Sequence, residues 1–191
     1  MDLGNCPLTW HQQAKQYKQA NTFAAIYTAA LPPSITHEWK SMQHTALHCL
    51  SQALEVEIST YPQIRRAGIH VPAASAWLLH AAPQIYKFCN SQELYHGNLE
   101  WRRRIVGGDG GVCLWDGDEG FSVQRWVFWK QRFEGVEGLG RRGFAGRVID
   151  DVVGRARQAI KVMRDVEQEE GLALDGISGL FGRHDVPSLV L

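Results

Sequence analysis

Apolar residues recur every three or four positions in several long segments, and this period predicts α-helices. No segment shows the strict alternation of apolar and polar residues that is typical of a half-buried β-strand. The pattern therefore predicts an all-α fold, an irregular bundle of five to seven helices. The long helices are expected at about residues 36–60, 72–90, 122–137 and 144–170.

Local start and stop signals support these boundaries. Thr36 and Ser122 are suitable N-cap residues, and Pro72 fits the first turn of a helix. Gly171 is a typical left-handed C-cap. At the start of the chain, Thr9 predicts a helix to about residue 20, which a separate apolar stretch over residues 23–31 follows.

The segment 72–90 is apolar nearly all round, which is typical of a helix at the centre of a bundle. Pro83 lies inside it and cannot donate to the carbonyl of Leu79, so we expect a kink near residues 79–83. Two interpretations of its narrow polar stripe stay open: the wall of a cavity at the kink, or an exposed edge. The stripe consists of His80, Gln84, Lys87 and Ser91.

Glycine is concentrated after this segment, and a long glycine-rich loop is expected at about residues 97–121. The loop lacks the Gly-Lys-Ser/Thr ending of a nucleotide-binding P-loop and the spacing of a dinucleotide fingerprint. We expect one helical domain over residues 1–171. Residues 172–191 mix glycine and proline with apolar residues, which predicts a loosely packed C-terminal tail.

Composition and charge exclude several classes of protein. Twenty basic and twenty acidic side chains give a formal net charge of zero, which argues against a nucleic-acid-binding protein. No apolar run approaches the roughly 20 residues of a membrane span, and the first residues, which lack a basic start and an apolar core, lead us to expect no secretory signal. The four cysteines form no CxxC pair, so we expect free thiols, no cofactor, and a cytoplasmic or nuclear location.

Two features of the 36–60 helix bear on function. His44 and His48 are four residues apart, but they lie opposite the apolar face, where exposed histidines are more common than a metal site. We therefore expect no bound metal. Glu57 falls in the middle of the apolar face, so its carboxylate must pair, become protonated, or lie beyond the buried stretch.

An aromatic face on the 122–137 helix is formed by Trp126, Trp129 and Phe133. Aromatic side chains beside basic ones can stack on single-stranded nucleic acid. The balanced charge and the helical spacing favour core packing instead, and we expect no nucleic-acid partner.

Two stretches resemble a family of fungal helical proteins of unknown function. The first is the alanine-rich segment from Pro72 to Leu79, and the second is the signature GFSxxRWxFWKxRF from Gly120 to Phe133. The resemblance implies a helical fold and a fungal source. It implies no catalytic residues, since none are established for that family.

Two interpretations of function remain open. The first is a non-catalytic helical interaction module that binds a protein partner or itself, because no catalytic constellation was recognised and tryptophan is a favoured interface anchor. The second is a pocket for a small apolar ligand near the kinked helix, in a binder or a cofactor-independent enzyme, for example of fungal specialised metabolism. Its catalytic candidates are His80 and Glu57, and its ligand-binding candidates are Trp77, Gln84 and Tyr86.

Overall fold

The computed structural model describes residues 9–32, 36–91, 113–139 and 146–170. Within these ranges the chain forms an all-α fold, as the hydrophobic pattern predicts. The only β pairing in the part described is an isolated antiparallel bridge between Val56 and Cys113. The helices are α1 (Trp10–Ala30), α2 (Thr36–Leu54), α3 (Tyr61–Asn90), α5 (Val123–Glu137) and α6 (Arg147–Glu169).

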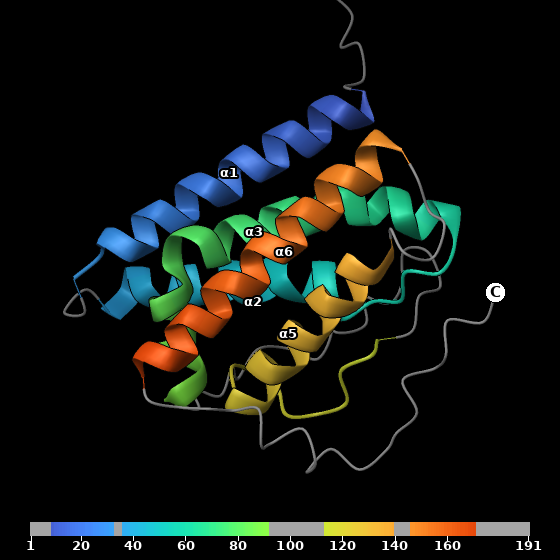
Figure 1. Cartoon of the computed structure of the whole chain (residues 1–191). Helices are drawn as coiled ribbons and strands as arrows, with labels where there is room; N and C mark the ends of the chain where they lie inside the picture. The colour runs from blue at the N-terminus through green and yellow to red at the C-terminus, as the bar shows by residue number, and fades with distance from the viewer. Residues whose placement is uncertain (1–8, 33–35, 92–112, 140–145, 171–191) are drawn as a thin grey trace, which may run out of the picture.

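Helix α3 is the centre of the bundle. It packs against α1, α2, α5 and α6, and α1 makes its main contacts with α3 and α2 only. Figure 1 shows α1 along one edge of the bundle, with α6 crossing in front of α3 and α5 on the side away from α1. This arrangement leaves one long side of α1 uncovered by any other helix described.

Helix α3 begins earlier than the proline at position 72 predicts. Thr60 and Gln63 form a reciprocal capping box, and Pro62 occupies the first turn in place of Pro72. Pro72 lies in the helix interior and is buried, so packing of the surrounding core outweighs the missing backbone bond. The predicted kink is confirmed at Ala81, whose backbone leaves the helical region two residues before Pro83.

Helix α2 ends at Leu54, not near residue 60, and this corrects the placement of Glu57. The chain beyond Leu54 is extended: the backbone amide of Leu114 donates to the carbonyl of Glu55, and Val56 bridges to Cys113. A helical wheel therefore does not apply to Glu57. The structure places Glu57 beyond the end of α2, half-buried between the buried Val56 and Ile58.

Helix α1 is one continuous helix rather than a helix to residue 20 and a separate stretch after it. Its predicted N-cap is confirmed, because Thr9 and Gln12 form a capping box. Helix α5 begins at the predicted cap, where the hydroxyl of Ser122 accepts from the amide of Arg125. Gly171, the tail over 172–191 and most of the glycine-rich loop lie outside the described residues.

Two helical glycines test how tightly α6 is packed. A Cβ at Gly154 would meet nothing within 4 Å, so Gly154→Ala should stabilise the fold by about 0.5–1 kcal/mol through better helix propensity. A Cβ at Gly68 of α3 would lie 2.8 Å from Cγ1 of Val148 on α6, so Gly68→Ala should destabilise the fold. Urea unfolding measures both, and a loss of stability in Gly154→Ala would contradict the packing described.

Candidate functional site

The predicted ligand-binding residues Trp77 and Tyr86 are core residues. Trp77 is fully buried, and its indole N–H donates to Oδ1 of Asn21 on α1 at 2.8 Å. Tyr86 packs edge-on against Trp126, with ring centroids 5.1 Å apart. Its hydroxyl is buried and has no hydrogen-bond partner in the part of the chain described. Burial, reinforced by the nearby carboxylate of Glu167, raises the pKa of Tyr86.

The predicted polar stripe of α3 is an outer edge of the bundle. His80 is exposed, and Gln84 is half-buried, with its amide nitrogen 3.5 Å from the carbonyl of Ala29 near the end of α1. Glu57 is half-buried in the connection that precedes α3. His80 lies nineteen residues along α3 from Tyr61, about 28 Å at 1.5 Å per residue. The fold therefore does not bring His80 and Glu57 into one site.

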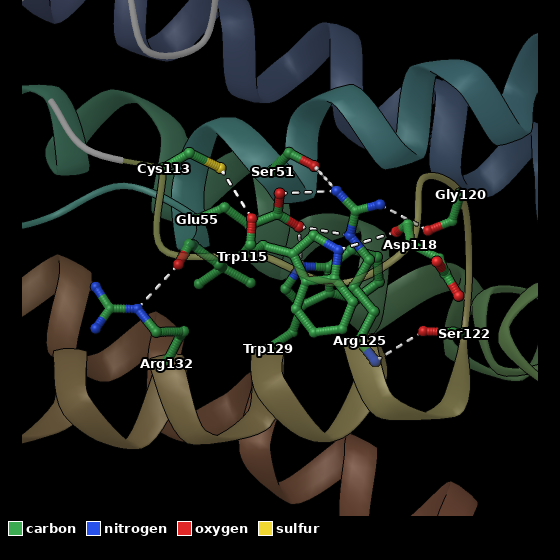
Figure 2. A network of polar contacts seen from close by, with 11 residues as sticks. Ser51, Glu55, Cys113, Trp115, Asp118, Gly120, Ser122, Arg125, Trp129 and Arg132 are labelled. Carbon is green, nitrogen blue, oxygen red and sulfur yellow. Dashed lines mark hydrogen bonds and ion pairs between the residues drawn. The ribbon is translucent and has the colours of Figure 1, made fainter. Parts of the chain in front are cut away.

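The most deeply buried carboxylate among the residues described is Glu55, one residue after α2. Only 1% of this residue is exposed. Its two carboxylate oxygens each accept a hydrogen bond from the guanidinium of Arg125 on α5 at 2.7 Å. The indole N–H of Trp129, one turn further along α5, donates to the same carboxylate at 2.8 Å (Figure 2). On a helical wheel of the 36–60 segment Glu55 lies with His44 and His48, opposite the apolar face; in the structure its contacts with Arg125 and Trp129 of α5 bury it.

The guanidinium of Arg125 is surrounded on every side. Its remaining donors reach the Ser51 hydroxyl at 3.1 Å and the Gly120 carbonyl at 2.6 Å. Its central carbon lies 5.4 Å from the ring of Trp115 and 5.6 Å from that of Trp129, both at cation–π distance. Figure 2 shows these contacts converging from α2, α5 and the segment before α5. The charges of Glu55 and Arg125 thus satisfy each other inside the protein.

Arg132, about one turn after Trp129 in α5, binds the backbone at the end of α2. Its guanidinium donates to the carbonyls of Leu54 and Val56 at 2.9 and 3.0 Å. Carbonyls at a helix C-terminus have no partner within the helix and carry partial negative charge, so a cation there is stabilising. The extended turn after α2 is thus held from α5.

A second carboxylate is bound on the neighbouring face of α5. Glu167 of α6 accepts from Nζ of Lys130 at 2.7 Å and from the indole N–H of Trp126 at 2.8 Å. All three residues are buried. Helix α5 therefore binds two carboxylates in the same way, each with a cation and an indole four residues apart: Glu55, just after α2, and Glu167 of α6.

A third polar cluster lies where α1, α2 and α3 meet. The hydroxyl of Tyr17 contacts the thiol of Cys49, and the ring of Tyr17 packs edge-on against His70 at 5.1 Å. Burial raises the pKa of the Cys49 thiol to about 12, so this thiol is not an activated nucleophile. Burial, with Arg66 and His48 nearby, lowers the pKa of His70 to about 4.

No cation-binding cluster emerges from these groups: among the residues described, no three His, Cys, Asp or Glu side chains are placed to hold one metal ion. The ring centroids of His44 and His48 lie 6.5 Å apart on exposed side chains. No helix in the described ranges has the length and apolar character needed to cross a membrane.

The surface of α1 carries the feature that sequence reasoning missed. Phe23, Ile26 and Tyr27 are 73%, 50% and 41% exposed, and the rings of Phe23 and Tyr27 stack. The inner face of α1 is instead buried through Asn21, Ala25 and Thr28. From residue 21 onward, α1 thus turns small residues toward its own core and large apolar residues outward, the reverse of an ordinary surface helix, whereas Tyr17 in the preceding turn packs against the core.

Comparison with known proteins places the chain in a family. The family model described as "Protein of unknown function (DUF3632)" matches residues 3–133, more than half of the chain. The chain belongs to the DUF3632 family. No curated protein and no solved structure gives a significant match.

The stretch that matches the DUF3632 family contains the whole Glu55 site. The signature predicted from the sequence supplies its parts: Gly120 offers a carbonyl, Ser122 caps α5, and Arg125 and Trp129 bind the carboxylate. The sequence signal that could have pointed to Glu55 is an arginine beside the aromatic face of the predicted helix, because an arginine that becomes buried there needs an acidic partner from another segment.

Glu55 and Glu57 form a matched pair for testing this site. Glu55→Gln should reduce the free energy of unfolding by about 3–5 kcal/mol, because it leaves the buried Arg125 cation without its counter-charge. Glu57→Gln removes a charge from a half-buried side chain two residues away and should change stability by less than about 0.5 kcal/mol. Chemical unfolding followed by tryptophan fluorescence measures both. Equal effects would contradict the assignment of Glu55 as the structural carboxylate.

His70 predicts an acid sensitivity of the contact between α1 and α3. Its pKa of about 4 lies below the ordinary 6.5, so the unfolded chain binds the proton more readily. The neutral, buried His70 therefore stabilises the folded state fully above pH 6.5, and this stabilisation is lost as the pH falls toward 4. Allowing for the partial exposure of the ring, the free energy of unfolding should fall by about 2–3 kcal/mol. The wild-type protein should lose this much more stability than His70→Gln between pH 7 and pH 4, and parallel curves would count against the prediction.

Proposed function

We propose that this DUF3632 protein is a non-catalytic helical interaction module that binds a helix of a protein partner through the outer face of α1. The observation that carries the proposal is the exposure of Phe23, Ile26 and Tyr27 on an otherwise well-formed helix. Exposed apolar clusters of this kind are characteristic of interaction sites. Aromatic side chains at their centre supply much of the binding energy when they are buried by a partner.

The inner face of α1 supports the same proposal. Large apolar side chains stabilise a fold when they turn inward, and burying one contributes roughly 1.5–3 kcal/mol. In the second half of α1 the fold gains little of that contribution, because the inward positions there are occupied by Asn21, Ala25 and Thr28. A role for the outward side chains outside this bundle accounts for their placement.

The buried polar groups support a structural rather than a chemical role. Glu55 and Glu167 are each bound by a cation and an indole, and Cys49 is kept protonated by burial. A small apolar ligand at His80 and Glu57 gains no support, since the fold keeps these residues apart. We further propose a cytoplasmic or nuclear location, on the free Cys49, Cys89 and Cys113, and a fungal source, on the resemblance of the signature.

Phe23→Glu separates interaction from folding. Because Phe23 is 73% exposed, the substitution should change the free energy of unfolding by less than about 0.5 kcal/mol. It should abolish capture of protein partners, since a carboxylate would be buried in the contact without a counter-charge. The measurement is cross-linked capture from cells with wild-type and variant protein, read by mass spectrometry.

The matched control is Lys161→Glu, which places a glutamate at an exposed position of α6. It should leave capture unchanged. If Phe23→Glu captures the same proteins as the wild type while remaining folded, α1 is not the binding face and the proposal fails.

A further inference from the structure

A stripe along α1 has the spacing of a coiled-coil seam. Its residues follow one another at alternating intervals of four and three, and every one of them is exposed. Hydrophobic seams of coiled coils repeat every 3.5 residues, because this period keeps one face turned toward a second helix. The stripe consists of Gln12, Gln16, Gln19, Phe23, Ile26 and Ala30.

No residue of this stripe is charged. Helix α1 contains no acidic side chain, and its two lysines, Lys15 and Lys18, lie beside the stripe rather than in it. The stripe is divided along its length: the N-terminal half is glutamine, and the C-terminal half is Phe23, Ile26 and Ala30. An exposed helix face of more than five turns without one charge is unusual in a water-soluble surface, where charged residues are normally interspersed.

We propose that the occupant of this face is α1 of a second copy of the chain, packed parallel to the first about a two-fold axis. This inference rests on the proposed function and names its partner. A two-fold contact requires a surface that complements itself. Glutamine carries both a donor and an acceptor, so it can pair with its own counterpart. The apolar half likewise meets an apolar half.

The stripe has a glutamine half and an apolar half, and this arrangement favours parallel over antiparallel packing of the two helices. An antiparallel pairing along its whole length would put Gln16 opposite Ile26 and Gln19 opposite Phe23. Each amide would then be desolvated against an apolar side chain, which is costly without a hydrogen bond. A parallel pairing places like against like at every position. Lys15 would then flank residue 20 of the second copy, an alanine, so no like charges meet.

The charge balance of the chain favours the same partner. Copies with a large net charge repel each other at a distance, and this repulsion keeps many proteins monomeric. Here the formal net charge is zero. Two copies therefore approach without a long-range barrier, and the uncharged stripe adds no local one.

Charge exchange at position 19 tests the two-fold parallel contact directly. Gln19→Glu and Gln19→Lys each place like charges opposite one another in the homodimer and should raise its dissociation constant at least about tenfold. An equimolar mixture of the two variants should associate again, because opposite charges then meet. Analytical ultracentrifugation of the full chain at about 1–100 µM, a range that detects micromolar dissociation constants, measures all three samples.

The control places the same charges elsewhere: Gln168→Glu and Gln168→Lys on the exposed surface of α6 should leave dimerisation unchanged, alone or mixed. Circular dichroism at each step verifies that α1 remains helical. Phe23→Glu, which needs no charge exchange, should also weaken the dimer at least about tenfold, as expected for an aromatic at the centre of an interface.

The outcomes separate this inference from the proposed function. A wild-type chain that is monomeric throughout the range, or a dimer indifferent to position 19, overturns the second copy as occupant. If Phe23 is still required for capture of another protein, the interaction module stands with a different partner. If Phe23→Glu instead changes hydrogen exchange in residues 171–191 of a monomer, the chain's own C-terminal segment occupies the face and the inference is equally overturned.

Discussion

The bundle depends on one buried carboxylate. Glu55 lies where α2 ends, and its charge can be buried only because Arg125 and Trp129 of α5 saturate both of its oxygens. An unpaired carboxylate at that depth would cost several kcal/mol, so the position of α5 follows from the position of Glu55. The segment before α5 follows in turn, since the Gly120 carbonyl and the Trp115 ring complete the shell around Arg125. A contact between groups 70 residues apart thus determines how three segments meet.

The same device on the neighbouring face of α5 gives the helix its second partner. Lys130 and Trp126 hold Glu167 of α6, so α5 is fixed between α2 and α6 by charge as well as by apolar packing. Directional contacts of this kind select one rotation of the helix among those that apolar packing alone would tolerate. Against this ordered interior, the outer face of α1 stands apart, because its large side chains make no comparable contacts.

Much of the fold could be predicted from periodicity and caps. The all-α class, the cap at Ser122, the kink near Pro83 and the buried aromatics of α5 all follow from local rules that the structure obeys. The errors fall where tertiary contacts override local preference. Pro72 sits in a helix interior because the core around it compensates, and α2 stops at Leu54 because Arg132 and the strand-like segment at Cys113 take over its last carbonyls.

The candidate site was harder to predict than the fold. A helical wheel drawn past the true end of α2 placed Glu57 on the buried face of the helix and Glu55 on the exposed face. The exposed face of α1 was split between two predicted segments, so its continuous stripe was hidden.

The contact between Lys130 of α5 and Glu167 of α6 bears on where the chain can be truncated. The family match ends at residue 133, just after the basic and aromatic residues that hold Glu167, whereas Glu167 itself lies well beyond that boundary. A fragment cut where the sequence similarity stops would lack Glu167, which forms a buried ion pair with Lys130. It would also expose to water the surface of α3 that α6 covers. We therefore expect a stable fragment to include α6, which the boundary of the family match leaves out.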